Sequence, residues 1–309
     1  MVRDELQQRI RTVSPAGFES LALDIFQSQA QLNPLYAEFL NLLGIMPSKV
    51  EHLEDIPCLP IQFFKNHIVK TGNWDTAAVF SSSGTTGATT SRHAVRDLDW
   101  YRENATRGFE NAYGPVEDHC FLALLPSYLE RSGSSLVSMA EHFISRSTFV
   151  QSGFFLNNTD ILRKVIHDCR DKNIPTVLLG VSFALWDLAL EGDLGYPELI
   201  VMETGGMKGR RQEITRVELH EILIKVLGVS TIHSEYGMTE LLSQAYSKGG
   251  GVFKPGPTLR VWARDITDPL SAQKAGKTGA LNVVDLANLD TISFIATDDL
   301  GKVYEDGTF

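Results

Sequence analysis

Three short polar stretches lie at the ends of predicted strands, and their residue types suit chemistry on a phosphate ester. The first, residues 81–92, reads SSSGTTGATTSR. Its two glycines let the backbone turn and approach a ligand closely, while hydroxyl and successive N–H groups can donate hydrogen bonds to phosphate oxygens. The stretch lacks the GxxxxGK[ST] spacing of a Walker loop. On composition alone, a Ser/Thr/Gly-rich surface loop explains it equally well.

The second stretch, residues 233–240, reads HSEYGMTE and follows a predicted strand at 229–232. Ligands of α/β sheets usually bind at the carboxyl ends of the strands. The ring of Tyr236 can stack on a purine, and the carboxylate of Glu240 can bind Mg²⁺ through its oxygens. Taken alone, the stretch is more typical of a strand-to-loop corner with a packed tyrosine.

The third stretch, residues 296–301, reads ATDDLG. A carboxylate at a strand end can accept hydrogen bonds from both hydroxyls of a ribose. Asp-Asp-x-Gly is also an ordinary hairpin sequence, so this stretch by itself indicates little.

The elements that must position these stretches alternate between strand and helix. Buried apolar runs predict strands at 77–81, 120–125, 176–181 and 199–202, with amphipathic helices between them. This alternation predicts a largely parallel sheet covered by helices. Two helices are expected in the first 45 residues, and short strands after residue 240 predict a β-rich portion. We therefore expect three parts: a helical segment and connector at 1–75, an α/β core at 76–240 and a β-rich subdomain at 241–309.

Composition excludes several classes of function. The 309 residues include 28 Lys and Arg against 38 Asp and Glu, a net charge of −10, which disfavours nucleic-acid and anionic membrane partners. The three cysteines form no CxxC pair, which argues against a disulfide framework or a zinc site. The N-terminus lacks the apolar core of a signal peptide, and no apolar stretch is long enough to span a membrane. We expect a cytoplasmic protein.

Together and in this order, the three stretches resemble the core motifs of the adenylate-forming (acyl-activating) enzymes. That superfamily carries a Ser/Thr/Gly phosphate loop, a Tyr-Gly-x-Thr-Glu segment and a Thr-Gly-Asp segment, which are similar here to 82–87, 236–240 and 297–299. The sequences of 234–241 and 297–301 are most similar to those of the acyl-protein synthetases (long-chain-fatty-acid–protein ligases) of bacterial luciferase systems. The segment 56–65 is similar to that branch as well.

The resemblance implies a fold, a reaction and its cofactors. The fold would be α/β, with the mostly parallel, helix-covered sheets of the adenylate-forming N-terminal domain and a smaller β-rich portion that completes the nucleotide site. The reaction would use ATP and Mg²⁺ to convert a carboxylic acid, here a fatty acid, into acyl-AMP and pyrophosphate. The acyl group would then pass to a thiol of an accepting protein or of coenzyme A.

The resemblance also implies roles for individual residues. The expected site residues are the phosphate-holding Ser82, Ser83, Gly84, Thr85, Thr86 and Gly87, the adenine- and acyl-lining Gly205, Gly206 and Met207, the adenine-flanking Tyr236 with Gly237, the α-phosphate contact Thr239, the magnesium ligand Glu240 and the ribose-holding Asp299. Gly87 is followed by Ala-Thr-Thr rather than by the usual x-Pro-Lys. We therefore expect Arg92 to replace the missing lysine charge.

The chain stops at Phe309, where related enzymes continue into a mobile C-terminal domain with a catalytic lysine. We therefore expect an adenylation core in which that domain is absent or truncated. Two alternatives stay open. One is an acyl-CoA ligase of the phenylacetate or coronafacate type. The other is a catalytically inactive nucleotide-binding module.

Overall fold

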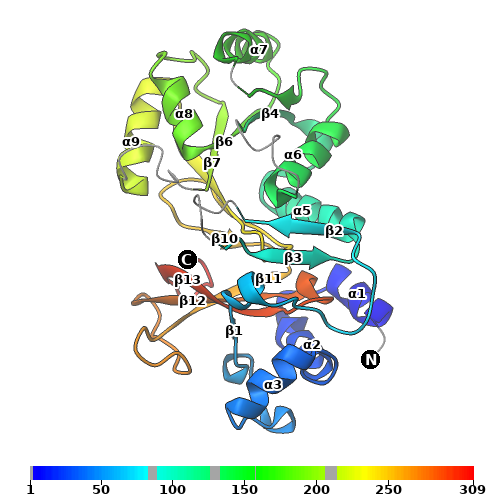
Figure 1. Cartoon of the computed structure of the whole chain (residues 1–309). Coiled ribbons are helices and arrows are strands. Elements are labelled where there is room, and N and C mark those ends of the chain that lie inside the picture. The colour runs from blue at the N-terminus through cyan, green and yellow to red at the C-terminus, as the bar shows by residue number, and fades with distance from the viewer. Residues whose placement is uncertain (1–2, 83–88, 126–132, 157, 206–213) are drawn as a thin grey trace. The chain divides into compact units, whose positions relative to one another are not determined.

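The computed structural model describes residues 3–82, 89–125, 133–156, 158–205 and 214–309 (Figure 1). The chain forms two compact units. The first unit consists of Met1–Gly108, Met238–Gln244 and Lys254–Phe309, and the second of Phe109–Gly237 and Ala245–Phe253. Each unit takes residues from more than one of the three parts expected from the sequence, whose boundaries stay a prediction.

The first unit begins with helices α1 (Arg3–Arg11), α2 (Phe18–Leu32) and α3 (Pro34–Leu42). Asn33 caps α3 by accepting a hydrogen bond from the Tyr36 N–H at 3.1 Å, and Pro34 starts the first turn. The expectation of two helices in the first 45 residues was wrong because it missed α1. This helix is mostly charged, and only Leu6 and Ile10 form its buried apolar stripe.

Two small sheets follow in the first unit. One has the order β1 (Leu59–Pro60), β13 (Phe294–Lys302), β12 (Thr278–Asp285) and β11 (Leu259–Arg264), in which only β1 and β13 pair in parallel. The other pairs β2 (Ala78–Ser81) with β3 (Arg92–Val95) in antiparallel fashion. The unit also contains α4 (Phe63–Asn66), β10 (Lys254–Pro255) and the first part of α5 (Leu98–Tyr113).

The second unit contains a mostly parallel sheet. Its strands are β4 (Cys120–Leu124), β5 (Gly153–Phe154), β6 (Thr176–Val181), β7 (Ile200–Thr204), β8 (Ile232–Tyr236) and β9 (Ala245–Ser247). The order is β5-β4-β6-β7-β8-β9, and only β9 runs antiparallel to its neighbour. Every residue of β4 and β6 is buried, as expected for strands covered on both faces.

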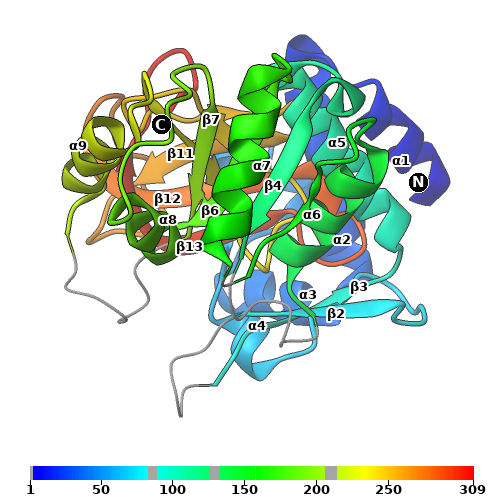
Figure 2. The same cartoon turned by 90° about the horizontal axis from the view of Figure 1, so that it is seen from above.

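Four helices alternate with these strands: α6 (Ser135–Arg146), α7 (Thr159–Asp171), α8 (Ser182–Ala189) and α9 (Arg216–Leu227) (Figure 2). Helix α6 packs on β4, α8 on β6 and β7, and α9 on β8. The alternation of the sequence therefore produces the predicted helix-covered parallel sheet. No helix in the described residues is long and apolar enough to cross a membrane.

Candidate functional site

Glu240 is a buried residue of the first unit, with 5% of its surface exposed. Burial raises the pKa of its carboxyl group, and the charge of Asp299 adds to this rise. A hydrogen bond with the Ser91 side chain and the charge of Lys65 oppose it. The Glu240 carbonyl oxygen accepts a hydrogen bond from Asn288 Nδ2 at 2.7 Å. The carboxylate thus lies among polar and charged groups but is shielded from bulk water, an arrangement that favours cation binding.

The expected phosphate loop begins beside this carboxylate. Ser82 follows β2, donates its N–H to the Ser91 carbonyl at 3.1 Å, and accepts the Ser91 N–H on its Oγ at 2.9 Å. Because the Ser91 side chain also hydrogen-bonds Glu240, Ser82 is connected to the predicted magnesium ligand through one residue. Ser83, Gly84, Thr85, Thr86 and Gly87 lie outside the described residues. Arg92 is exposed at the start of β3, opposite Ser81 in the register.

A buried histidine holds the backbone next to Glu240. His93 Nδ1 lies 2.8 Å from the Thr239 carbonyl oxygen, and Nε2 lies 3.0 Å from Thr291 Oγ1. A carbonyl oxygen can only accept, so Nδ1 carries the proton and the neutral ring accepts from the Thr291 hydroxyl. Burial lowers the pKa of His93 to about 4, opposed by the hydrogen bond to Thr239. The ring therefore stays neutral at pH 7 and fixes the Thr239 backbone.

The His93 environment predicts a pH-dependent stability. The unfolded chain binds a proton at His93 as the pH falls through about 6.5, whereas the folded chain binds it only near 4. The free energy of unfolding therefore falls by about 3 kcal/mol between pH 7 and pH 4 because of this group. A His93→Asn variant keeps a donor near Nδ1 and cannot titrate. Its unfolding free energy should lie below that of the wild type at pH 7, and this difference should shrink by about 3 kcal/mol as the pH falls to 4. Urea denaturation at several pH values measures the difference. The control is the exposed His52→Asn, and a constant deficit for His93→Asn would contradict the prediction.

Asp299 and Lys65 are connected to the same region through α4. Asp299 lies in β13, is exposed, and donates its N–H to Thr297 Oγ1 at 3.2 Å. Gln62, just before α4, hydrogen-bonds Asp298. From α4 itself, the Phe64 ring packs edge-on against His93 with 5.3 Å between centroids. Helix α4 and the residue before it therefore contact both β13 and the His93 that holds Thr239, and the exposed Lys65 follows Phe64 in this helix.

Asp285 holds the segment that follows Glu240. Its Oδ2 accepts the N–H groups of Leu242 at 2.7 Å and Ser243 at 2.9 Å, and its Oδ1 accepts Ser243 Oγ at 2.6 Å and the Ala287 N–H at 3.0 Å. Burial raises the pKa of Asp285 to about 6, and these four donors oppose the rise. This carboxylate ties residues 242–243 to the end of β12.

The other expected site residues that the structure describes lie in the second unit, at the carboxyl edge of its sheet. Gly205 follows β7 with a φ of +71°, and its carbonyl oxygen accepts a hydrogen bond from Ser182 Oγ at 3.1 Å. Tyr236 ends β8, with its ring 5.8 Å from that of Phe253, and Gly237 is exposed. Strands β7 and β8 are parallel neighbours, so Gly205 and Tyr236 emerge at the same edge. Gly206 and Met207 lie outside the described residues.

A buried polar cluster supports this edge. Glu203 accepts hydrogen bonds from Ser182 Oγ at 2.8 Å and Ser234 Oγ at 3.1 Å, and it pairs with Arg216 Nε at 3.6 Å. Burial alone would raise the pKa of Glu203, but the interaction with His220, whose Nε2 lies 3.5 Å from Oε2, and the Arg216 charge outweigh it and leave the pKa lowered. Since Ser182 also binds the Gly205 carbonyl, this ionised carboxylate helps to fix the end of β7.

Sequence reasoning assigned no site role to Lys65, Ser91 or His93. A signal for Lys65 exists in its place in segment 56–65, which is similar to the acyl-protein synthetases. Ser91 lies in the first polar stretch but outside the part matched to the phosphate loop. His93 had no motif around it, because its role depends on a tertiary contact with Thr239.

No protein-family model matches the chain, and no curated protein matches its sequence. Solved structures do match. An ATP-bound RpMatB-BxBclM chimera aligns with a TM-score of 0.57 and 17% identity over 77% of this chain and 47% of its own. ATP-bound MatB from Rhodopseudomonas palustris aligns with a TM-score of 0.56 and 17% identity, over 77% of this chain and 48% of its own.

A 2-hydroxyisobutyryl-CoA ligase in complex with 2-HIB-AMP and CoA aligns with a TM-score of 0.67 and 14% identity, over 95% of this chain and 67% of its own. The chain thus spans about half the length of the chimera and of MatB, and two thirds of the length of the ligase. These likenesses, with the helix-covered parallel sheet and the small β-rich sheet, confirm that the chain has the α/β fold of adenylate-forming enzymes.

Proposed function

We propose that this protein uses ATP to convert a carboxylic acid into acyl-AMP and pyrophosphate, for transfer to a thiol. One observation carries the proposal: in the first unit, Ser82 and Glu240 both contact Ser91. Two motifs far apart in the sequence, one for phosphates and one for a metal, therefore meet at one residue. A surface loop and an unrelated strand corner would have no reason to meet in this way.

The described residues fit a magnesium site of the kind that ATP brings with it. Among them no group of three or more His, Cys, Asp or Glu side chains is arranged to hold a metal by itself. Magnesium bound with ATP needs only one or two carboxylates, since phosphates and water complete its shell. Glu240 would hold the ion, with Asp299 nearby. Bound there, Mg²⁺ would neutralise charge on the phosphates.

In the reaction, a carboxylate oxygen of the acid attacks the α-phosphorus of ATP, and the bond from that phosphorus to the bridging oxygen of pyrophosphate breaks. Both reactants are anions, so the protein must offset their repulsion. Ser82 and the loop it begins would donate to the phosphates, Thr239 would contact the α-phosphate, and Lys65 and Arg92 would add positive charge. Asp299 would accept the ribose hydroxyls. Tyr236, Gly237 and Gly205 belong to the second unit, and their roles toward the adenine and acyl groups stay predictions.

Carboxylate-dependent ATP–pyrophosphate exchange tests the proposal, because it reports the first half-reaction without an acyl acceptor. We expect exchange with Mg²⁺ and a long-chain fatty acid, as for the acyl-protein synthetases that the motifs resemble. Exchange only with aromatic acids would favour a ligase of the phenylacetate type. ATP binding without exchange across the acid panel would contradict the proposal and favour an inactive nucleotide-binding module.

Coenzyme A is the second candidate acceptor beside a protein thiol. The observation that favours it is the structural likeness to a 2-hydroxyisobutyryl-CoA ligase crystallised with 2-HIB-AMP and CoA. Incubating the protein with ATP, Mg²⁺, the active acid and CoA, and measuring acyl-CoA by mass spectrometry, separates the two acceptors. Acyl-CoA at catalytic yield would assign coenzyme A. Acyl-AMP that accumulates unchanged would favour a protein acceptor.

Lys65 provides a sharper test of the site. Replacing Lys65 with Gln should lower the exchange rate about 10- to 100-fold, because a cation near the phosphates and Glu240 is lost. Lys65 is exposed, so the unfolding free energy should change by less than about 0.5 kcal/mol. Lys277→Gln, an exposed lysine of the same unit, is the matched control and should exchange at the wild-type rate. Equal rates for both variants would remove Lys65 from the site.

A further inference from the structure

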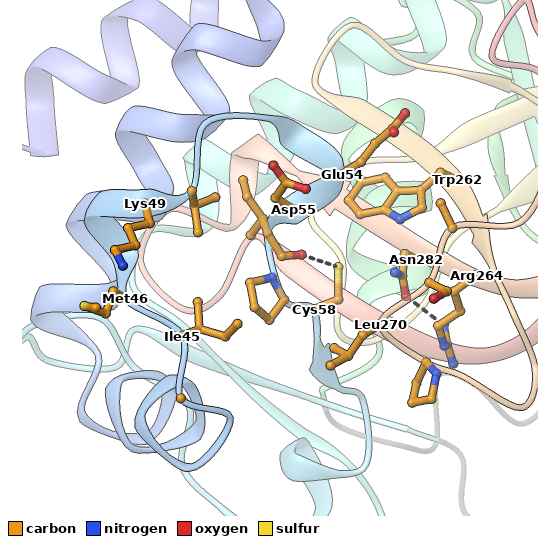
Figure 3. A pocket seen from close by; sticks show the side chains of 17 residues that line it. Ile45, Met46, Lys49, Glu54, Asp55, Cys58, Trp262, Arg264, Leu270 and Asn282 are labelled. Atoms are coloured by element: carbon orange, nitrogen blue, oxygen red, sulfur yellow. Dashed lines mark hydrogen bonds between the residues drawn. The ribbon is translucent and has the colours of Figure 1, made fainter.

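The first unit contains a cavity of about 400 Å³ that none of the described site residues lines (Figure 3). One wall is the segment from Gly44 to Cys58, and the other consists of β11, β12 and the loop at 269–272. Its volume is within the usual range for small-molecule sites. The proposed acid activation assigns no role to this cavity.

A positive charge lies at one end of the cavity without a paired acid. Arg264 Nη1 donates to the Leu281 carbonyl and to Asn282 Oδ1, both at 2.8 Å, and Nη2 donates to the Thr297 carbonyl at 2.6 Å. All three acceptors are neutral. Within the described part of the chain, no carboxylate forms an ion pair with Arg264, although Asp298 acts on it at longer range. Burial lowers the pKa of Arg264, the direction expected for a desolvated cation.

Large apolar side chains form part of the rest of the cavity lining, alongside the charged side chains of Lys49, Glu54 and Asp55. Figure 3 shows Trp262 and Leu270 beside Arg264 and Asn282, with Ile45 on the facing wall. Leu270 is 61% exposed, so a large apolar side chain lies open to solvent at this pocket. An aromatic wall next to an arginine suits a ligand with an apolar body and an anionic end.

The charges around the cavity limit how negative the ligand can be. Lys49 and Arg264 are balanced by the exposed carboxylates of Glu54 and Asp55, so the lining has no net charge. A phosphate ester with two charges would be repelled by these two acids and would meet only one half-buried cation, Arg264. A single carboxylate, by contrast, can form a two-pronged pair with one guanidinium.

We propose that this cavity is a binding site for a small organic monocarboxylic acid, with its carboxylate on Arg264 and its apolar body against Trp262, Ile45 and Leu270. The site is separate from the residues proposed to activate an acid, and binding there requires neither ATP nor Mg²⁺. The proposal therefore stands whether or not the chain catalyses exchange.

The test is isothermal titration of the whole chain with 4-phenylbutyrate and with its amide, in buffer without ATP or Mg²⁺. We expect the acid to bind at least about 10-fold more tightly than the amide, because charge-assisted hydrogen bonds contribute about 1.5–3 kcal/mol. Arg264→Gln should remove this preference. Lys277→Gln, an exposed lysine outside the cavity, should leave it intact.

A second variant covers the case in which Arg264→Gln does not fold. Leu270→Glu changes an exposed residue and places a negative charge at the cavity. It should therefore weaken binding of the acid at least about 10-fold while the chain still folds. Acid and amide binding with equal affinity, no binding of the acid, or acid binding unchanged by Leu270→Glu would each overturn the proposal. The last outcome would place the acid elsewhere, as expected if it binds only where it is activated.

Discussion

Replacing Glu240 with Gln should lower the rate of acid-dependent ATP–pyrophosphate exchange by at least about 100-fold. Glutamine keeps the shape of the side chain but removes the charge that we propose binds magnesium, and losses of this size are typical when one electrostatic contact of a reaction centre is removed. The fold should persist, because a buried carboxylate beside another acid contributes little to stability. The free energy of unfolding should be unchanged or slightly raised.

Exchange with radiolabelled pyrophosphate measures the rate, and urea denaturation measures the free energy of unfolding. Glu305→Gln, an exposed glutamate of the same unit, should leave both quantities unchanged. Because burial raises the pKa of Glu240, exchange by the wild type should also fall as the pH falls through that raised value, when protonation removes the ligand. Retained exchange in Glu240→Gln would remove this residue from the magnesium role.

The alternation of apolar runs allowed the fold to be predicted, because buried parallel strands and amphipathic helices differ in period and length. The strands expected at 120–125 and 176–181 correspond to β4 and β6. The same signal could not reveal α1, whose sequence is dominated by charge. It also could not separate the two compact units. Residues 238–244 and 245–253 adjoin in sequence, yet they pack in different units.

Only some residues of the candidate site could be predicted from the sequence. Thr239, Glu240 and Asp299 were predicted because they belong to motifs whose order along the chain is informative. Their neighbours His93 and Lys65 were missed, because a single histidine or lysine has meaning only through what it packs against. Glu203 lies two residues before Gly205, and no role was predicted for it from the sequence. Its burial and four polar neighbours come from the pairing of β7 with β6 and β8, which a sequence does not specify.

Replacing Asp285 should lower the stability of the fold, whereas replacing Glu240 should lower the rate of exchange. At pH 8 its carboxylate is ionised, since its pKa is about 6, and each oxygen accepts two hydrogen bonds. Asp285→Asn replaces one oxygen with an amide nitrogen that faces donors and leaves up to two of them unpaired in a buried place. We expect the free energy of unfolding to fall by about 3 kcal/mol at pH 8, measured by urea denaturation. Asp75→Asn, an exposed aspartate of the same unit, should change it by less than about 0.5 kcal/mol.

The two variants should then separate positioning from chemistry. Asp285 holds Leu242 and Ser243, two and three residues after Glu240, so Asp285→Asn should lower exchange because Glu240 is less firmly placed, and stability should fall with it. Glu240→Gln should lower exchange while stability is kept. If Asp285→Asn kept the wild-type unfolding free energy, the four hydrogen bonds would not hold this segment. A loss of exchange in that variant would then require a direct role for Asp285 at the nucleotide.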